Sequence, residues 1–302
     1  MVEQIPVTLV GDGRVGRALA GALGPRGGLA GPVVRRGGRE WDEVPPGRRP
    51  VLLCTGAQHL EEAVAECPPE HRPDLVFMQN GALEPWLAAR GLEGCTRALL
   101  FLSAEEGGAG LRDGGGRSSV TGPWAAATRQ ALGVAGIGAR EVSRRDFGRL
   151  AFEKLLWSSV FWCLSAGRGG APVGDLVQDP GALCELEDLV EELLAVGGPA
   201  YGLLKGGGGA LGEGSAEQWD GGGAGEKETA AAEAAGLVDG LLAYSHSIPD
   251  AVPSVPVALE EFPWRNGFFL QLRRSPRHLR ALRRAQPSAD VAAALARLDA
   301  ET

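Results

Sequence analysis

Residues 5–23 read IPVTLVGDGRVGRALAGAL, and they predict the start of an α/β fold. The first part, 5–10, is a short apolar run of the kind that forms a buried strand. The last part is apolar at Val15, Leu19 and Leu23, which is the spacing of one helix face, and it ends at a glycine. A strand, a glycine-rich turn and a helix are therefore expected in direct succession.

The turn itself, GDGRVG, matches the pattern G-x-G-x-x-G. In that pattern the first glycine makes a tight turn, the second lets the backbone approach a pyrophosphate, and the third lets the helix pack on the strand. The helix N-terminus then offers its unpaired N–H groups to the anion. The alternative is a turn without a ligand, because the chain holds 47 glycines. We expect a dinucleotide to bind at Gly11, Asp12, Gly13, Arg14, Val15 and Gly16.

The first half of the chain continues this alternation of strand and helix. Apolar runs predict strands, and a helical pattern is seen at 59–66. Continuous apolar strands separated by helices indicate a parallel sheet that is covered on both faces. We therefore expect an α/β protein with an N-terminal Rossmann-type, doubly wound parallel sheet. The further expected strands are 32–35, 50–55, 74–79, 97–103, 116–121 and 139–143.

The second half has a helical period and predicts a mostly α-helical domain. The expected domains are a dinucleotide-binding domain at 1–143 and a helical domain for substrate binding and dimerisation at 144–302. Residues 206–225 contain ten glycines and are expected to form a flexible surface insertion, with a smaller one at 105–116. Six arginines at 273–284 predict a solvated helix or, alternatively, a contact patch for an acidic partner. The expected helices are 147–162, 183–196, 230–244 and 291–298.

The second expected strand is followed by two arginines that bear on the cofactor. It ends in VVRRGGR, with Arg35 and Arg36 where many NAD sites carry an acid. That acid binds the ribose 2′-hydroxyl of NAD, whereas the planar donors of arginine suit a 2′-phosphate. The alternative is a pair of solvated arginines in an arginine-rich chain. The pattern favours NADP(H) as the cofactor.

Composition excludes several classes of function. The net charge is −8 and the pI is about 5.2, which argues against a nucleic-acid partner. No apolar run approaches the roughly 18 residues of a membrane span, and the direct passage from Met1 into an expected strand argues against a signal peptide. The five cysteines lack a C-x-x-C motif and the four histidines lie in unrelated contexts, so neither disulfides nor a metal site are expected. We expect a cytoplasmic protein, with an organelle as the alternative.

Three further segments occur in a fixed order: FMQNG at 77–81, FEKLLWSS at 152–159 and EFPWRNG at 261–267. Together with the N-terminal loop they resemble the ketopantoate reductase family, whose members are NADPH-dependent and reduce 2-dehydropantoate to pantoate. The resemblance covers nearly the whole chain. It implies a two-domain oxidoreductase of pantothenate biosynthesis that uses NADP(H) and a small 2-oxo acid. A homodimer is a further expectation.

The resemblance also implies roles for individual residues. Lys154 corresponds to the general acid toward the substrate carbonyl, and Glu261 to a glutamate that holds substrate and lysine. Asn80 corresponds to an asparagine beside the nicotinamide, and Gln58 to a polar position near the cofactor. Ser254 corresponds to a serine that binds the substrate carboxylate.

The chemistry agrees with a lysine as the acid. Hydride delivery to a ketone leaves an alkoxide, so an acid must stand at that oxygen. Burial can lower the pKa of a lysine from about 10.4, whereas an arginine stays charged. Only three of the 30 basic residues are lysines, which makes Lys154 an unusual choice in this chain. The alternative is an ordinary surface lysine on an amphipathic helix.

Two positions depart from the family pattern. Where the family carries asparagines one and two turns after the lysine, this chain has Ser158 and Trp162. Positions 154, 158 and 162 share one helix face, so we expect a smaller and more apolar substrate pocket and a less hydroxylated 2-oxo acid than ketopantoate. The alternatives are a catalytically silent NADP(H)-binding protein of the same fold, and a sugar-acid or opine-type dehydrogenase that shares only the first domain.

Overall fold

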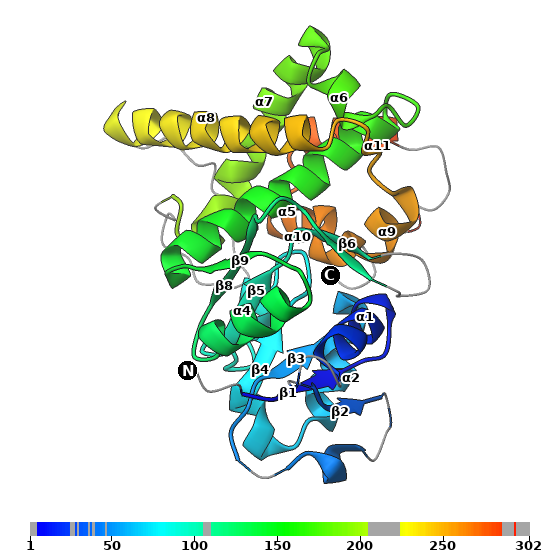
Figure 1. Ribbon diagram of the computed structural model, residues 1–302. Coiled ribbons are helices and arrows are strands. Elements are labelled where there is room, and N and C mark those ends of the chain that lie inside the picture. Colours follow the sequence, from blue (N-terminus) through cyan, green and yellow to red (C-terminus); the bar gives the residue numbers. More distant parts are fainter. Residues whose placement is uncertain are drawn as a thin grey trace. The chain divides into compact units, whose positions relative to one another are not determined.

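A computed structural model describes residues 5–24, 28, 30–35, 37, 40–45, 47–104, 110–204, 224–285 and 293. The chain divides into two compact units, Met1–Phe147 and Gly148–Thr302 (Figure 1). The expected division at 143/144 lies about one helical turn before this one. Arg36, residues 206–223 of the expected insertion and all but Ala293 of the expected helix at 291–298 lie outside the described residues.

The first unit is built around a seven-stranded sheet with the order β2-β1-β3-β4-β5-β8-β9. Neighbouring strands are parallel from β2 through β5, which confirms the expected Rossmann-type fold. β5 and β8 are antiparallel, and β8 pairs with β9 in parallel. The strands are β1 (Val7–Val10), β2 (Ala30–Val34), β3 (Val51–Leu53), β4 (Leu75–Phe77), β5 (Thr96–Leu99), β8 (Ser118–Thr121) and β9 (Ala139–Glu141).

The seven-stranded sheet is mostly parallel, and its antiparallel pairing of β5 with β8 follows from the segment between them, in which the described residues 110–116 of the expected surface insertion are partly or fully exposed. Between β5 and β8 the chain forms a hairpin in which β6 (Leu102–Ala104) pairs antiparallel with β7 (Leu111–Asp113). Because a hairpin needs no crossover helix, it returns the chain directly and β8 enters the sheet in the opposite direction. Residues 105–109 lie outside the described part of the chain.

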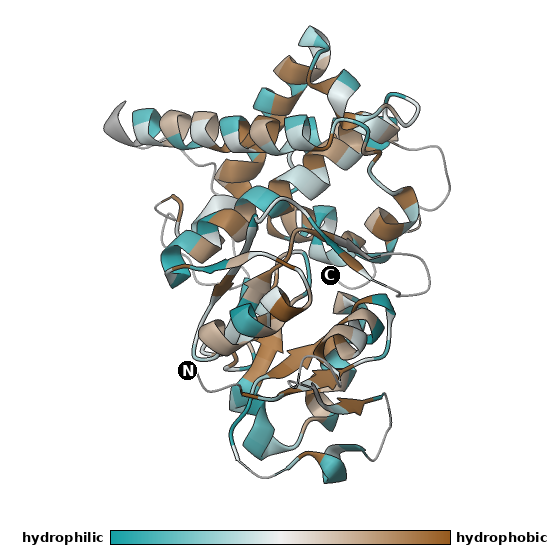
Figure 2. Ribbon diagram, viewed as in Figure 1, coloured by the Kyte–Doolittle hydropathy of each residue, from teal (hydrophilic) through white to brown (hydrophobic). Residues whose placement is uncertain are grey.

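The helices of this unit bury their apolar residues against the sheet. Leu19 and Leu23 of α1 lie in one core with Leu9 of β1, Leu52 of β3 and Val76 of β4. Figure 2 shows apolar residues concentrated in these strands. The packed sheet therefore positions the loops at its strand ends. The helices are α1 (Arg14–Leu23), α2 (Leu60–Glu66), α3 (Glu84–Ala88) and α4 (Ala125–Val134), with 3-10 turns η1 (Glu40–Glu43), η2 (Ala57–His59) and η3 (Pro69–Asp74).

The second unit is helical in its described part, as expected. Helix α7 contacts α8, α10 and α11, so it lies at the centre of the packing. An aromatic cluster fills the core, where Phe152 contacts Tyr201 and Phe269, and Phe268 contacts both of these. The elements are α5 (Arg144–Ala166), α6 (Val173–Leu176), α7 (Pro180–Gly197), η5 (Gly198–Tyr201), α8 (Ala224–Ser247), α9 (Val255–Glu260), η6 (Phe262–Trp264), α10 (Asn266–Leu272) and α11 (Pro276–Ala285).

The arginine-rich segment packs against α7 with its apolar face, while its six arginines are exposed as the solvated-helix expectation requires. Helix α11 buries Ala281 and Leu282. Arg277 lies 3.2 Å from Asp188, and Arg284 pairs with Glu185. Among the described helices, none combines the length and the apolar character that a bilayer crossing requires.

Candidate active site

The three glycines of the N-terminal loop occupy the positions that a dinucleotide loop requires. Gly11 has φ +99°, and a Cβ there would lie 2.9 Å from Cγ2 of Thr55, so only glycine fits the turn. A Cβ on Gly16 would overlap the carbonyl oxygen of Gly11, which explains the close packing of helix on strand. A Cβ on Gly13 would meet no atom within 4 Å, because this residue faces open space. The loop thus leaves room for a ligand at the N-terminus of α1.

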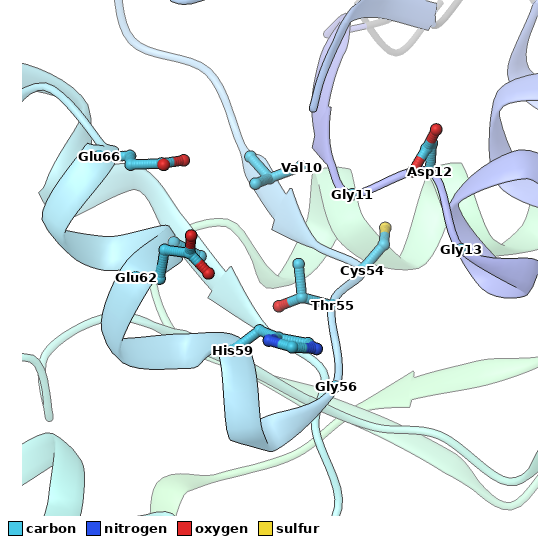
Figure 3. Close-up of a pocket in the computed structure, with 11 residues that line it drawn as sticks. Val10, Gly11, Asp12, Gly13, Cys54, Thr55, Gly56, His59, Glu62 and Glu66 are labelled. Atoms are coloured by element: carbon cyan, nitrogen blue, oxygen red, sulfur yellow. The ribbon is translucent and has the colours of Figure 1, made fainter. Parts of the chain in front are cut away.

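A pocket of about 270 Å³ lies beside this loop (Figure 3). It forms where β1 and β3 end side by side, and β1 is the strand at which the sheet order reverses direction. Open α/β sheets bind their ligands at this kind of switch point. These residues fit a dinucleotide, since the open backbone of the glycine loop and the N-terminus of α1 border the cavity. The lining residues are Val10, Gly11, Asp12, Gly13, Cys54, Thr55, Gly56, His59, Glu62, Ala63 and Glu66.

Sequence reasoning did not find the pocket wall that follows β3. Thr55, His59, Glu62 and Glu66 come from the end of β3, from η2 and from α2 (Figure 3). Glu66 accepts a hydrogen bond from the backbone N–H of Gly37 at 3.1 Å, which ties the loop after β2 to α2. Only the position of these residues after the third strand indicated the wall, because the third strand of a Rossmann unit ends at the same edge of the sheet as the first.

Arg35, which the sequence assigned to cofactor choice, lies directly after β2. Its Nε is 3.4 Å from Asp12 Oδ2 and its Nη1 is 3.3 Å from Glu40 Oε1. Its side chain is 60% exposed. Ion pairs that are this exposed contribute about 0–1 kcal/mol to stability. They therefore keep the guanidinium beside the loop but are weak enough for a ligand to replace them. Arg36 lies outside the described residues.

The QNG segment at 79–81 follows β4, and its glutamine forms hydrogen bonds with the end of the neighbouring strand β3. Gln79 is buried and donates from Nε2 to the carbonyl oxygens of Leu53 at 2.8 Å and Thr55 at 3.0 Å. This glutamine therefore clamps the end of β3 to the end of β4. Asn80 comes next and is partly buried. The side-chain amide of Gln58 lies against Gly56, at the rim of the same strand end.

The helical unit brings together Lys154 and Glu261, which are far apart in the sequence. Lys154 is partly buried on α5, and Glu261 is the C-cap of α9. Arg265 donates from Nε to Oε2 of Glu261 at 2.8 Å and also from Nη2 to the same oxygen. Burial, followed by the positive charge of Arg265, lowers the pKa of Lys154 to about 7, against the opposing effect of the Glu261 carboxylate. A lysine with this pKa can give and accept a proton near neutral pH.

The other positions expected at the substrate have structural contacts of their own. Ser158 is buried and donates to the carbonyl oxygen of Leu155 at 3.0 Å. Trp162 is 1% exposed, and its indole N–H has no hydrogen-bond partner. Ser254 is the N-cap of α9 and accepts a hydrogen bond from the N–H of Val257 at 3.5 Å. The hydrogen bonds of Ser158 and Ser254 and the burial of Trp162 are structural features of the helical unit. The roles of these three side chains toward a substrate stay predictions.

Metal binding finds no support in the described parts of the chain, where no group of three or more His, Cys, Asp or Glu side chains lies close enough to hold an ion. The Cys54 thiol lines the pocket, and burial raises its pKa to about 12. A thiol with this pKa stays protonated at neutral pH and is a poor nucleophile.

Comparison with known proteins relates the whole chain to a class of oxidoreductase folds. No family model and no curated protein matches the sequence. Among solved structures, a probable 2-dehydropantoate 2-reductase from Bacillus subtilis matches with a TM-score of 0.58 at 11% identity, covering 98% of this chain and 99% of that chain. A D-mandelate dehydrogenase with NADH and anilino(oxo)acetate matches with a TM-score of 0.59 at 12% identity, covering 96% and 99%.

A dimeric ketopantoate reductase from Staphylococcus aureus matches with a TM-score of 0.54 at 14% identity, covering 98% of both chains. The chain therefore has the fold that these two reductases and this dehydrogenase share. The resemblance to the ketopantoate reductases is confirmed at the level of the fold, and the low identities agree with a divergent sequence.

Proposed function

We propose that the protein is a divergent member of the ketopantoate reductase family that reduces a 2-oxo acid with NADPH. The observation that carries the proposal is the pKa of Lys154, lowered to about 7 beside Glu261. A surface lysine, the alternative for this position, would keep its ordinary value. Strongly perturbed pKa values cluster at functional sites, and buried ion-pair networks shift pKa values as well, so the Lys154→Ala variant described below is the deciding test.

In this mechanism Lys154 acts as the general acid. NADPH held by the N-terminal loop would supply the hydride to the carbonyl carbon. Lys154 gives its proton to the carbonyl oxygen, so the substrate gains one hydride and one proton and becomes a 2-hydroxy acid. Solvent then restores the proton on the lysine. Glu261 favours the charged form of Lys154 and so keeps part of the population protonated.

NADP(H) is the cofactor that we propose, with Arg35 and Arg36 at the 2′-phosphate. The 2′-phosphate can replace the exposed ion pairs of Arg35. A charge-assisted hydrogen bond contributes roughly 1.5–3 kcal/mol, whereas such an exposed ion pair contributes about 0–1 kcal/mol. NADH is the second candidate, since Asp12, Glu62 and Glu66 line the pocket and would repel a further negative charge. Fluorescence titration with both cofactors distinguishes them.

Several finer assignments belong to the same proposal. Asn80 and Gln58 would contact the cofactor, and Ser254 the substrate. The helical domain would also carry a homodimer contact, as the dimeric Staphylococcus aureus reductase suggests, and size-exclusion chromatography with light scattering measures this. We further propose a cytoplasmic location, which fractionation of cells tests.

The test of the reaction is a panel of 2-oxo acids with NADPH, with Lys154→Ala as the variant. We expect turnover to fall by roughly two to four orders of magnitude, the usual effect of removing a positioned acid, while NADPH affinity stays within twofold. Wild-type turnover in the variant would exclude Lys154 as the acid. Binding of NADPH without turnover of any 2-oxo acid would favour the alternative, a catalytically silent cofactor-binding protein. The replacement of the family asparagines by Ser158 and Trp162 also favours that alternative.

A further inference from the structure

Glu66 connects the cofactor cavity to the loop that follows β2. It is the last residue of α2 and accepts a hydrogen bond from the backbone N–H of Gly37, with its two oxygens at 3.1 and 3.3 Å. Glu66 also lines the cavity together with Gly11 and Gly13, and its carboxylate points away from α2 toward the end of β1 (Figure 3). The cavity wall and the loop after β2 therefore meet at this carboxylate.

The stability of α2 does not explain a carboxylate at this position. A negative charge at the C-terminal end of a helix opposes the helix dipole, and α2 has no basic residue in its last turn to offset it. Gly37 has φ +62°, the left-handed conformation of a turn. Backbone N–H groups in turns can bind anions. The hydrogen bond to Gly37 therefore gives Glu66 a role in the loop rather than in the helix.

The loop after β2 is the place where a dinucleotide site distinguishes NADPH from NADH. The 2′-phosphate of NADPH or the 2′-hydroxyl of NADH binds at this strand end. Arg35 provides a cationic donor there, and Gly37 provides a neutral donor two residues later. Asp12 and Glu40 lie beside the positive charge of Arg35. The Gly37 N–H carries no net charge, so its hydrogen bond does not neutralise Glu66.

We propose that Glu66 competes with the 2′-phosphate of NADPH for the Gly37 N–H and so limits how strongly the protein prefers NADPH over NADH. A phosphate at this loop uses the same donor and is repelled by the carboxylate, whereas the 2′-hydroxyl of NADH can donate a hydrogen bond to it. Arg35 favours the phosphate, so the two residues act in opposite directions. The inference rests on the proposed function and names the residue of the cofactor site that acts against the phosphorylated cofactor.

Fluorescence titration of the wild-type protein and of Glu66→Gln with NADPH and NADH tests this competition. Glutamine keeps an oxygen that can accept the Gly37 hydrogen bond, and it removes the charge. We expect Glu66→Gln to bind NADPH about three- to tenfold more tightly, because an exposed charge no longer acts on a phosphate that carries roughly −1.5 to −2 charges. The affinity for NADH should stay within about twofold, so the ratio of the two affinities should rise.

Glu70→Gln is the matched control, because Glu70 is an exposed glutamate of the same unit that lies outside the cavity lining. This variant removes the same charge and should leave both affinities within about twofold. Salt gives a second readout, since the gain of Glu66→Gln should shrink at about 1 M salt, where the screening length is about 3 Å. The nicotinamide-free fragments 2′,5′-ADP and 5′-ADP should show the same pattern, because the effect belongs to the adenosine end.

The outcomes separate the inference from the proposed function. An unchanged or lower ratio of NADPH to NADH affinity in Glu66→Gln, or an equal gain in Glu70→Gln, overturns the inference even if the protein reduces 2-oxo acids. A higher ratio in Glu66→Gln, together with no turnover of any 2-oxo acid, supports the inference and removes the reductase. If the wild-type protein binds neither NADPH nor NADH, both the cofactor site and the inference are wrong.

Discussion

Replacing Lys154 by methionine should stabilise the protein, and the gain should depend on pH. Methionine keeps the length of the side chain and removes the charge. The folded state holds the pKa of Lys154 at about 7, whereas its ordinary value is 10.5. At about 1.4 kcal/mol for each pKa unit, this difference corresponds to roughly 5 kcal/mol of destabilisation when the lysine is protonated in both states.

The sign follows from which state holds the proton. Below pH 7 both the folded and the unfolded states carry it, so the full penalty applies. Between pH 7 and 10.5 the unfolded state carries the proton and the folded state does not, so the free energy of unfolding rises with pH. From pH 7 to pH 9 this rise amounts to about 2 kcal/mol, and Lys154→Met should lack it.

Urea unfolding of both proteins at pH 6 and pH 9 measures the effect. The advantage of Lys154→Met should be about 3 kcal/mol larger at pH 6 than at pH 9. Lys227→Met is the matched control, because Lys227 is an exposed lysine of α8, and it should leave the pH dependence unchanged. Parallel pH dependences of the wild-type protein and Lys154→Met would refute a lowered pKa at Lys154.

Three further predictions concern the cofactor loop and the substrate. NADPH should bind at least tenfold more tightly than NADH, and Arg35→Ala should reduce this preference; equal affinities in fluorescence titration would contradict the role of Arg35. Gly16→Ala should abolish cofactor binding, because its Cβ would overlap the Gly11 carbonyl oxygen, whereas Gly21→Ala on the same helix, where a Cβ has space, should bind normally. Ketopantoate should be a poorer substrate than a less hydroxylated 2-oxo acid, since an unpaired buried hydroxyl costs about 1–3 kcal/mol; a higher kcat/KM for ketopantoate would contradict the pocket expected from Trp162.

The sequence by itself determined the features that depend on neighbouring residues. The strand, turn and helix at 5–23 were predictable because the three glycines restrict the backbone within six positions, and Gly11 and Gly16 adopt the expected packing. The parallel arrangement of β1 to β5 followed from apolar runs separated by helices. The hairpin at β6 and β7 was not predictable, because its pairing joins residues across a polar, glycine-rich stretch with little apolar periodicity.

Only the tertiary structure decided the electrostatics of the two candidate sites. The wall formed by Thr55, His59, Glu62 and Glu66 follows from the strand order, which no local pattern encodes. Lys154 was identified from the sequence, but its pKa depends on burial and on Arg265, more than one hundred positions away. Charges act through space and burial arises from packing, so both quantities exist only once distant segments of the chain have come together.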